Sequence, residues 1–229
     1  MHYRTVLGNP DSDWRENRRE AARAEIVDQA WSLARQTGLL GFSMRDLARV
    51  LGMAAPSLYS YFDSKHALYD AMYADGYRGY LALDRLPAGD LRSELLAGAR
   101  RFACFGQADP VRYQLLFQRT IPDFAPTPSS YSLAQEAYER DFAASRLLGL
   151  SRQRDLDLVT GVISGLVAQQ LANEPDSDRW LRLLDDAVDM LVHHVSSAGS
   201  RTRPRELGDV PPRRRRRRSA ARSAEGEGA

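Results

Sequence analysis

The apolar residues of this chain recur at spacings of three and four along most of its length, which is the period of an amphipathic helix. No segment shows the persistent alternation or the hairpin dipeptides that predict β-strands. Glycine, proline and capping residues divide the pattern into segments. The expected helices cover approximately residues 14–37, 44–51, 56–62, 64–83, 90–105, 110–118, 129–148, 152–173 and 176–196. The expected fold class is therefore all-α.

The stretch from Ser43 to Lys65 predicts two short helices joined by a tight turn. The first places an apolar stripe on one face, with Ser43 before it as the N-cap. The stripe consists of Met44, Leu47, Ala48 and Leu51. Gly52 follows, where a left-handed backbone angle ends a helix without strain. Pro56 then stands where a first helical position has no amide hydrogen to lose, so a second helix is expected from about this residue.

The second helix carries a short outward face of hydroxyl groups and aromatic rings. Leu58 and Phe62 fall on its inner side, which leaves their neighbours free to face outward. The outward residues are Ser57, Tyr59, Ser60 and Tyr61, with Lys65 just beyond the helix. Hydroxyls and a cation suit the phosphates and base edges of a DNA groove.

The run FSMRDLARVLGMAAPSLYSYFDSKHAL resembles the helix-turn-helix of the TetR family of transcription regulators. The resemblance covers the first third of the chain and includes the LYxYF element and the SK-x-x-L that opens the next helix. It implies an N-terminal three-helix DNA-binding domain, followed by a helical domain that binds a small molecule and dimerises. In this family, ligand binding moves the helix after the motif and releases a palindromic DNA operator.

The same resemblance assigns roles in DNA binding. Arg45 is the candidate for a base contact, because its guanidinium fits the acceptors of guanine. Ser57 is expected near the groove floor. The residues that match phosphate-contacting positions are Ser43, Tyr59, Tyr61 and Lys65. Two alternatives stay open: one tyrosine ring, Tyr61 in particular, packs in the core, or Arg45 only pairs with an acidic neighbour.

Two further features bear on DNA binding. Ala54 and Ala55 stand where many relatives carry polar residues, and a methyl group can touch thymine but makes no hydrogen bond. We therefore expect fewer direct base contacts and more dependence on DNA shape. Arg15, Arg18 and Arg19 cluster where the resemblance implies backbone contacts. The alternative is that they are solvated arginines interleaved with acidic residues.

The pattern divides the chain into four parts. Residues 1–13 lack periodicity and are expected to form a mobile arm. Residues 14–65 form the expected DNA-binding domain, and residues 66–200 the expected ligand-binding and dimerisation domain. Residues 201–229 hold ten arginines against four acidic residues at low complexity, so a disordered tail is expected. Its run Arg213 to Arg218 either binds phosphates without specificity or is dispensable.

Two groups of residues in the expected body are candidates for function. An apolar ligand pocket is expected among recurring aromatic residues, namely Phe102, Phe105, Tyr113, Phe117, Tyr138 and Phe142. A homodimer interface is expected on apolar stripes of the last two helices, namely Leu156, Val159, Ile163, Leu166, Val167, Trp180, Leu184 and Val188. The alternative for both groups is ordinary packing inside one subunit.

Composition narrows the function classes. The chain has 229 residues and a formal net charge of +2, and no run of about 18 apolar residues occurs. We therefore expect a soluble, cytoplasmic protein without a membrane partner. Cys104 is the single cysteine, which excludes an internal disulfide and a multi-cysteine zinc site.

The sequence shows no arrangement typical of an enzyme. Cys104 has no histidine near it in the sequence, the four histidines are scattered, and no phosphate-binding loop or nucleophile elbow occurs. We predict no catalytic residues, metal or cofactor. The expected function is that of a repressor released from a palindromic operator by a small-molecule ligand. The alternatives are an activator of the same fold, or a helical small-molecule-binding protein without specific DNA binding.

Overall fold

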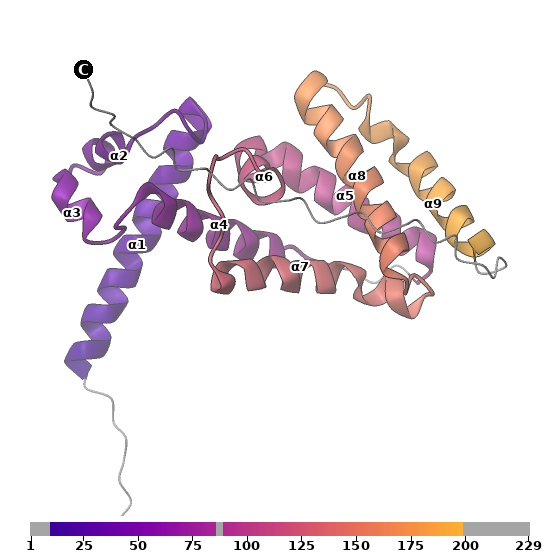
Figure 1. Ribbon diagram of the computed structural model, residues 1–229, viewed down its shortest axis with the longest axis horizontal. Helices are drawn as coiled ribbons and strands as arrows, with labels where there is room; N and C mark the ends of the chain where they lie inside the picture. The colour runs from indigo at the N-terminus through magenta and orange to yellow at the C-terminus, as the bar shows by residue number, and fades with distance from the viewer. Residues whose placement is uncertain (1–9, 86–88, 199–229) are drawn as a thin grey trace, which may run out of the picture.

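The computed structural model describes residues 10–85 and 89–198. Within them lie nine α-helices, one short 3-10 helix and no strand, which confirms the all-α class. The helices are α1 (Pro10–Thr37), α2 (Met44–Val50), α3 (Ala55–Tyr59), α4 (Lys65–Leu81), α5 (Leu91–Ala108), α6 (Pro110–Phe117), α7 (Pro128–Leu147), α8 (Gln153–Asn173), η1 (Leu181–Leu183) and α9 (Leu184–Ala198). A small head of α1–α3 lies at one end of an elongated molecule, and α4 leads from it into a body of α5–α9 (Figure 1). The expected tail with Arg213 to Arg218 lies outside the described residues.

Side chains cap several helices where the sequence predicts them. Ser43 begins α2 with a reciprocal pair: its Oγ accepts from the Asp46 amide at 3.2 Å, and Asp46 Oδ2 accepts from the Ser43 amide at 3.0 Å. Ser64, Asp90 and Asp109 cap α4, α5 and α6 without such a reciprocal pair, because each side chain accepts from the amide three positions later. These starts depend on residues three positions apart, which explains why the sequence alone identified them.

Helices α1 and α7 begin earlier than expected. Helix α1 begins at Pro10, so the last four residues of the expected mobile arm are helical. Helix α7 begins at Pro128 after Thr127, and not after Ser129 or Ser130, because Thr127 Oγ1 accepts from the Ser130 amide at 3.3 Å. Proline suits the first position of a helix, since no amide hydrogen is lost there.

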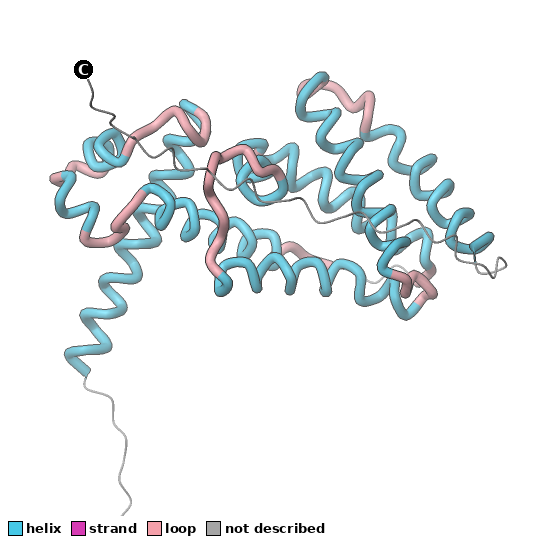
Figure 2. Tube along the Cα trace, viewed as in Figure 1, coloured by secondary structure: helices cyan, strands magenta, loops and turns pink. Residues whose placement is uncertain are grey.

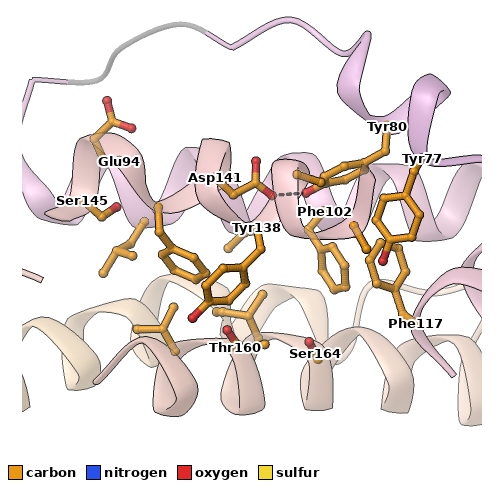
Figure 3. A pocket seen from close by; sticks show the side chains of 18 residues that line it. Tyr77, Tyr80, Glu94, Phe102, Phe117, Tyr138, Asp141, Ser145, Thr160 and Ser164 are labelled. Carbon is orange, nitrogen blue, oxygen red and sulfur yellow. Dashed lines mark hydrogen bonds between the residues drawn. The ribbon is translucent and has the colours of Figure 1, made fainter. Parts of the chain in front are cut away.

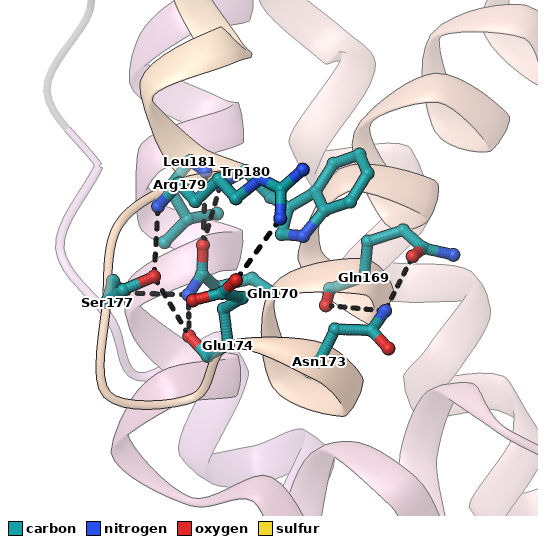
Figure 4. A network of polar contacts seen from close by, with 8 residues as sticks. All are labelled: Gln169, Gln170, Asn173, Glu174, Ser177, Arg179, Trp180 and Leu181. Carbon is teal, nitrogen blue, oxygen red and sulfur yellow. Dashed lines mark hydrogen bonds and ion pairs between the residues drawn. The ribbon is translucent and has the colours of Figure 1, made fainter.

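A buried amide holds the connection between α8 and α9. Helix α9 begins at Leu184, later than the sequence predicts, because residues 174–183 form turns and a 3-10 helix. The side chain of Gln170 is 0% exposed and points into this connection (Figure 4). Its Nε2 donates to the carbonyl of Ser177 at 2.8 Å, and its Oε1 accepts from the Trp180 amide at 2.9 Å. One side chain thus satisfies backbone groups that a continuous helix would have paired.

The head is a small apolar core that α1 closes. Trp31 of α1, Leu47 of α2, Leu58 of α3 and Phe62 are at most 1% exposed. Gly52, between α2 and α3, has a φ of +65°, a left-handed angle that a side chain would strain. This turn and the shared core fix the angle between α2 and α3.

Helix α4 belongs to both the head and the body. Leu68 and Met72 are buried in the head core at 0% exposure. Further along, the Tyr77 ring packs edge-on against Phe117 of α6, with centroids 5.7 Å apart. One continuous apolar cluster therefore runs from α1 through α4 to α6 and α7. A second cluster joins α5, α6, α8 and α9 at the far end.

The loop of residues 118–127 connects α6 to α7 and ends against α4 (Figure 2). Asp70 of α4 holds this end, because its Oδ1 accepts from the Thr127 amide at 2.7 Å and its Oδ2 accepts from Ser130 Oγ at 2.8 Å. The start of α7 is thereby tied to the helix that joins head and body.

Replacement of Gln170 by leucine is expected to destabilise the protein by about 2–4 kcal/mol, because several buried backbone groups lose their partner. Urea unfolding followed by circular dichroism measures the free energy of unfolding. Gln169→Leu is the matched control, since Gln169 is exposed on the same helix, and its effect should stay within about 0.5 kcal/mol. Equal effects of the two substitutions would contradict the role given to Gln170.

Ser43→Ala is expected to raise the pKa of Asp46 from about 2 towards its ordinary value of 3.8, because bonds from the Ser43 hydroxyl are the largest cause of the low value. The folded pKa is depressed, so the stability that this carboxylate contributes is present above its unfolded pKa and is lost as the pH falls towards 2. NMR titration of the Asp46 carboxyl carbon measures the pKa. An unchanged pKa in the variant would show that the capping pair does not stabilise the carboxylate.

Candidate functional site

Arg45 is free for a contact outside the protein. It lies exposed near the start of α2, and among the described residues it makes no ion pair and no side-chain hydrogen bond. The nearby carboxylate of Asp46 pairs instead with Arg49, at 2.7 Å. The alternative that Arg45 only pairs with an acidic neighbour is therefore not what the structure shows.

Three of the predicted DNA-binding residues face outward at α3. Ser57 and Ser60 are exposed, and Tyr59 is 47% exposed. Ser60 Oγ donates to the carbonyl of Ser57 at 2.6 Å, which orients one hydroxyl along the helix. The exposed surface of α3 thus carries two hydroxyl groups and a phenol.

Two other predicted residues, Ala55 and Tyr61, are half-buried and pack against the head core. The reason is helical geometry: each stands three positions from Leu58, which is 0% exposed, and residues three apart lie on one face. The core alternative for Tyr61 therefore holds for one side of its ring, and the DNA contact of the exposed remainder stays a prediction.

The cation of Lys65 is already engaged within the head. Its Nζ donates to the carbonyl of Phe42 and lies 4.4 Å from the centre of the Phe42 ring and 5.2 Å from that of Tyr69. Burial lowers the pKa of Lys65 below its ordinary value. This lysine ties the start of α4 to the residue before the Ser43 cap, so only its remaining hydrogens are available for the predicted phosphate contact.

Arginines of α1 extend the charged surface beside α3. Arg19 Nη2 donates to the carbonyl of Ser60 at 2.9 Å, and the guanidinium of Arg23 lies 4.1 Å from the centre of the Phe62 ring. A hollow of about 500 Å³ lies here, lined by Trp14, Arg15, Arg18, Arg19, Ala22, Ser60 and Tyr61. Arg15, Arg18 and Arg19, for which the sequence allowed two interpretations, therefore lie next to the C-terminal end of α3.

The body encloses a cavity of about 220 Å³ among α4, α5, α6, α7 and α8 (Figure 3). Four of the six predicted pocket residues line it, namely Phe102, Phe117, Tyr138 and Phe142. Phe105 and Tyr113 do not line it, and their assignment is wrong. The Phe105 ring packs against Tyr80 with centroids 5.0 Å apart, and Tyr113 is 2% exposed behind Phe102. Both rings are enclosed by protein side chains and have no face left for a ligand.

Two carboxylates line the cavity. Each is paired with an arginine that lies outside the lining of the cavity. Glu94 Oε2 lies 3.2 Å from Arg85 Nη2, and Asp141 Oδ1 lies 2.7 Å from Arg101 Nη2. Asp141 Oδ2 also accepts from the Tyr80 hydroxyl at 2.5 Å (Figure 3). Burial, and next the charge of Asp141, raise the pKa of Tyr80 above its ordinary value, so this phenol stays protonated and donates.

Helical spacing alone identifies some of the cavity residues that the sequence interpretation missed. Asp141 and Ser145 stand three and seven positions after Tyr138, so all three lie on one face of α7. Glu94 stands eight positions before Phe102 on α5, again on one face. In each case a polar residue lies on the same helix face as an aromatic residue, and this spacing is visible in the sequence.

Most of the predicted dimer residues lie inside their own subunit. Leu156, Val159, Ile163, Val167, Leu184 and Val188 are between 0% and 7% exposed. Leu166 is half-buried against the same cluster, and Trp180 is half-buried in the connection before α9. A fully enclosed side chain offers no surface to a partner, so the assignment of the six buried residues to an interface is wrong. That α8 and α9 form a dimer remains a prediction.

The outward faces of the same helices carry small and apolar residues. On α8, Leu158 is 39% exposed, and a Cβ added to Gly161 or Gly165 would meet no atom within 4 Å. Leu183 at the end of η1 is 41% exposed, and Met190 of α9 is 57% exposed. An exposed face of this kind allows another helix to approach closely.

Two further types of site were searched for among the described residues. No group of three histidine, cysteine, aspartate or glutamate side chains there is arranged to hold a metal ion. None of the helices in that part of the chain has the length and apolar character needed to cross a bilayer.

Comparison with known proteins agrees with this geometry. Residues 26–72, which run from α1 into α4, match the family described as bacterial regulatory proteins, tetR family. An HTH-type transcriptional repressor of Mycobacterium tuberculosis is 27% identical over 189 residues, covering 77% of this chain and 71% of that protein.

Solved structures share the fold. A tetR-family transcriptional regulator from Streptomyces coelicolor superposes with a TM-score of 0.58 at 19% identity, covering 79% of this chain and 83% of that one. A TetR variant from Acinetobacter baumannii in complex with minocycline gives a TM-score of 0.52 at 21% identity, covering 76% and 95%. Residues 26–72 thus match the tetR family in sequence, and the chain shares its fold with solved structures of TetR-family regulators.

Proposed function

We propose that this regulator is a repressor, that a homodimer binds a palindromic operator through α2 and α3, and that a small molecule in the body cavity releases it. The observation that carries the proposal is the unpaired, exposed Arg45 next to the exposed face of α3, on a motif whose other side is packed. The Mycobacterium tuberculosis relative is named a repressor, and the Acinetobacter baumannii structure contains minocycline.

Different residues of this surface are proposed to contact the bases and the phosphates of DNA. Among the residues of α2 and α3, Arg45 carries the guanidinium that is free to read a base edge, since Arg49 pairs with Asp46. Ser57 and Tyr59 have hydroxyl groups free to donate to phosphates, whereas the hydroxyls of Ser43 and Ser60 already donate to Asp46 and to the Ser57 carbonyl. The α1 arginines add positive charge beside them. Few groups thus read bases directly, which favours recognition of DNA shape and half-site spacing.

We assign DNA binding to residues 14–65 and ligand binding and dimerisation to residues 66–200. The two parts are distinguished by proposed function and not by packing, because one apolar cluster crosses the boundary between them through α4. The proposed cellular location is the cytoplasm, since the regulator must meet its operator there.

Helix α6 is the proposed route from the cavity to the head. Phe117 of α6 lines the cavity, and Leu116 packs so closely on α4 that a Cβ at Gly76 would lie 3.0 Å from it. At the other end of α6, the N-cap Asp109 accepts from Arg35 of α1 at 2.7 Å and 3.0 Å. A ligand that displaces Phe117 therefore acts on both α4 and α1.

Dimerisation is proposed on the outward faces of α8 and α9. Gly161 and Gly165 leave room for a partner helix, and Leu158 and Met190 provide exposed apolar surface beside them. Two such helices from each subunit form a four-helix interface, and a two-fold dimer matches a palindromic operator.

Arg45→Ala is expected to weaken binding to the operator by about 1–3 kcal/mol and binding to random DNA much less, because the guanidinium reads bases. The operator is first selected from DNA around the gene, and fluorescence anisotropy then gives both affinities at two salt concentrations. Arg49→Ala is the control, since Arg49 is exposed on the same helix and already pairs with Asp46. An equal loss of affinity for operator and random DNA would show that Arg45 contacts only the backbone.

Gly165→Lys is expected to shift the dimer towards monomer by at least about a hundredfold in dissociation constant, because a long cation replaces the space for a partner helix. The monomer fold should survive, since an added Cβ meets no atom within 4 Å. Sedimentation velocity measures the oligomeric state, with Glu136→Lys on the exposed surface of α7 as the control. A dimer that is unchanged in the Gly165 variant would place the interface elsewhere.

A further inference from the structure

The wall of the body cavity restricts the chemistry of the molecule that fits it. Six of its lining residues are aromatic, contributed by α4, α5, α6 and α7. Aromatic and aliphatic walls with few polar groups favour an apolar ligand that is flat enough to stack on rings.

The volume of the cavity restricts the size of the ligand. A dry apolar cavity of about 150 Å³ holds one benzene molecule. At about 220 Å³ this cavity is larger by roughly half, which fits about ten non-hydrogen atoms, or two fused rings. Five of its lining residues also border a wider hollow of about 940 Å³, which leaves room for substituents on those rings.

The charges of the wall favour an uncharged ligand. No lysine, arginine or histidine lines the cavity, so a ligand anion would face Glu94 and Asp141 without a cation of its own. A ligand cation would find both carboxylates already paired, with Arg85 and Arg101. Either ion would lose its water without gaining a free counter-charge, and burial of such an ion is costly.

Two serine hydroxyl groups of the wall, those of Ser145 and Ser164, have no hydrogen-bond partner among the described residues, and Ser145 is the more deeply buried. Ser145 of α7 is 1% exposed and lines the cavity, and its hydroxyl makes no hydrogen bond with any described residue. Most buried hydroxyl groups in proteins are hydrogen-bonded, so a buried hydroxyl that faces an apolar cavity indicates a partner in the ligand. Figure 3 places Ser145 at one end of the cavity, next to the rings that would hold the ligand.

We propose, on the basis of the ligand-release function above, that the ligand is an uncharged bicyclic aromatic molecule. Its rings stack among Phe102, Tyr138 and Phe142, and a single hydroxyl or N–H group bonds to Ser145. A ligand with a carboxylate, a phosphate or an ammonium group in the cavity is excluded by the same wall.

Three probes with one ring system test the charge of the ligand. Isothermal titration calorimetry of the full chain at pH 7 compares 2-naphthol, 2-naphthoate and 2-naphthylmethylammonium, which are neutral, anionic and cationic. The expected result is that 2-naphthol binds at least tenfold more tightly than either ion. Tighter binding of either ion, or no binding of 2-naphthol at millimolar concentration, overturns the proposal.

Two variants test the place and the polar contact. Gly98→Leu should abolish binding of 2-naphthol, because Gly98 lines the cavity and a Cβ there meets no atom within 4 Å, so the larger side chain fills the space. Ser145→Ala should weaken the binding of 2-naphthol about tenfold and leave the affinity for naphthalene unchanged, because naphthalene has no hydroxyl group. Ser132→Ala, on the exposed surface of α7, is the control. Binding that survives in the Gly98 variant, or equal effects of Ser145→Ala on both probes, overturns the assignment.

Operator binding of the same preparations separates this proposal from the proposed function. A specific DNA complex together with failure of 2-naphthol to bind overturns the ligand class alone. Binding of 2-naphthol in the cavity with no specific DNA complex supports the ligand class and overturns the regulator function.

Discussion

The rest of the structure depends on the burial of α4 in both the head and the body. Its first half packs into the head through Leu68 and Tyr69, and its second half packs into the body through Tyr77 and Tyr80. Tyr69 also donates its hydroxyl to the carbonyl of Leu39, and burial raises the pKa of Tyr69 to about 12. Because one rigid helix serves two close-packed regions, neither region can shift without the other.

Polar ties reinforce this coupling at places where the apolar core ends. Arg35 of α1 holds Asp109 at the start of α6, and Asp70 of α4 holds Thr127 before α7. Each tie involves an element that lines the cavity, namely α6 in the first and both α4 and α7 in the second. A molecule bound in the cavity, as proposed above, would therefore act on helices that are fixed to the head, which gives a physical route from the body to the surface at the end of the molecule.

Helices α8 and α9 illustrate how one helix serves two surfaces. The bulky residues of their stripes are enclosed with α5 in their own subunit, as Val167 and Val188 show. The opposite face of α8 is then left with Gly161 and Gly165, where little side chain can be buried within the monomer. Periodicity identified the apolar face correctly, but it carries no information on whether the subunit itself or a partner covers that face.

The sequence by itself determined the all-α class, the family, the helix-turn-helix and most helix starts, because these depend on residues a few positions apart, such as Ser43 with Asp46. Only the tertiary structure decided that the cation of Lys65 contacts Phe42, that Phe105 is core while Phe102 lines a cavity, and that Gln170 holds the α8–α9 connection. Those outcomes depend on how whole helices pack against one another. Residues distant in the chain meet only through that packing, and no local pattern records which of them will touch.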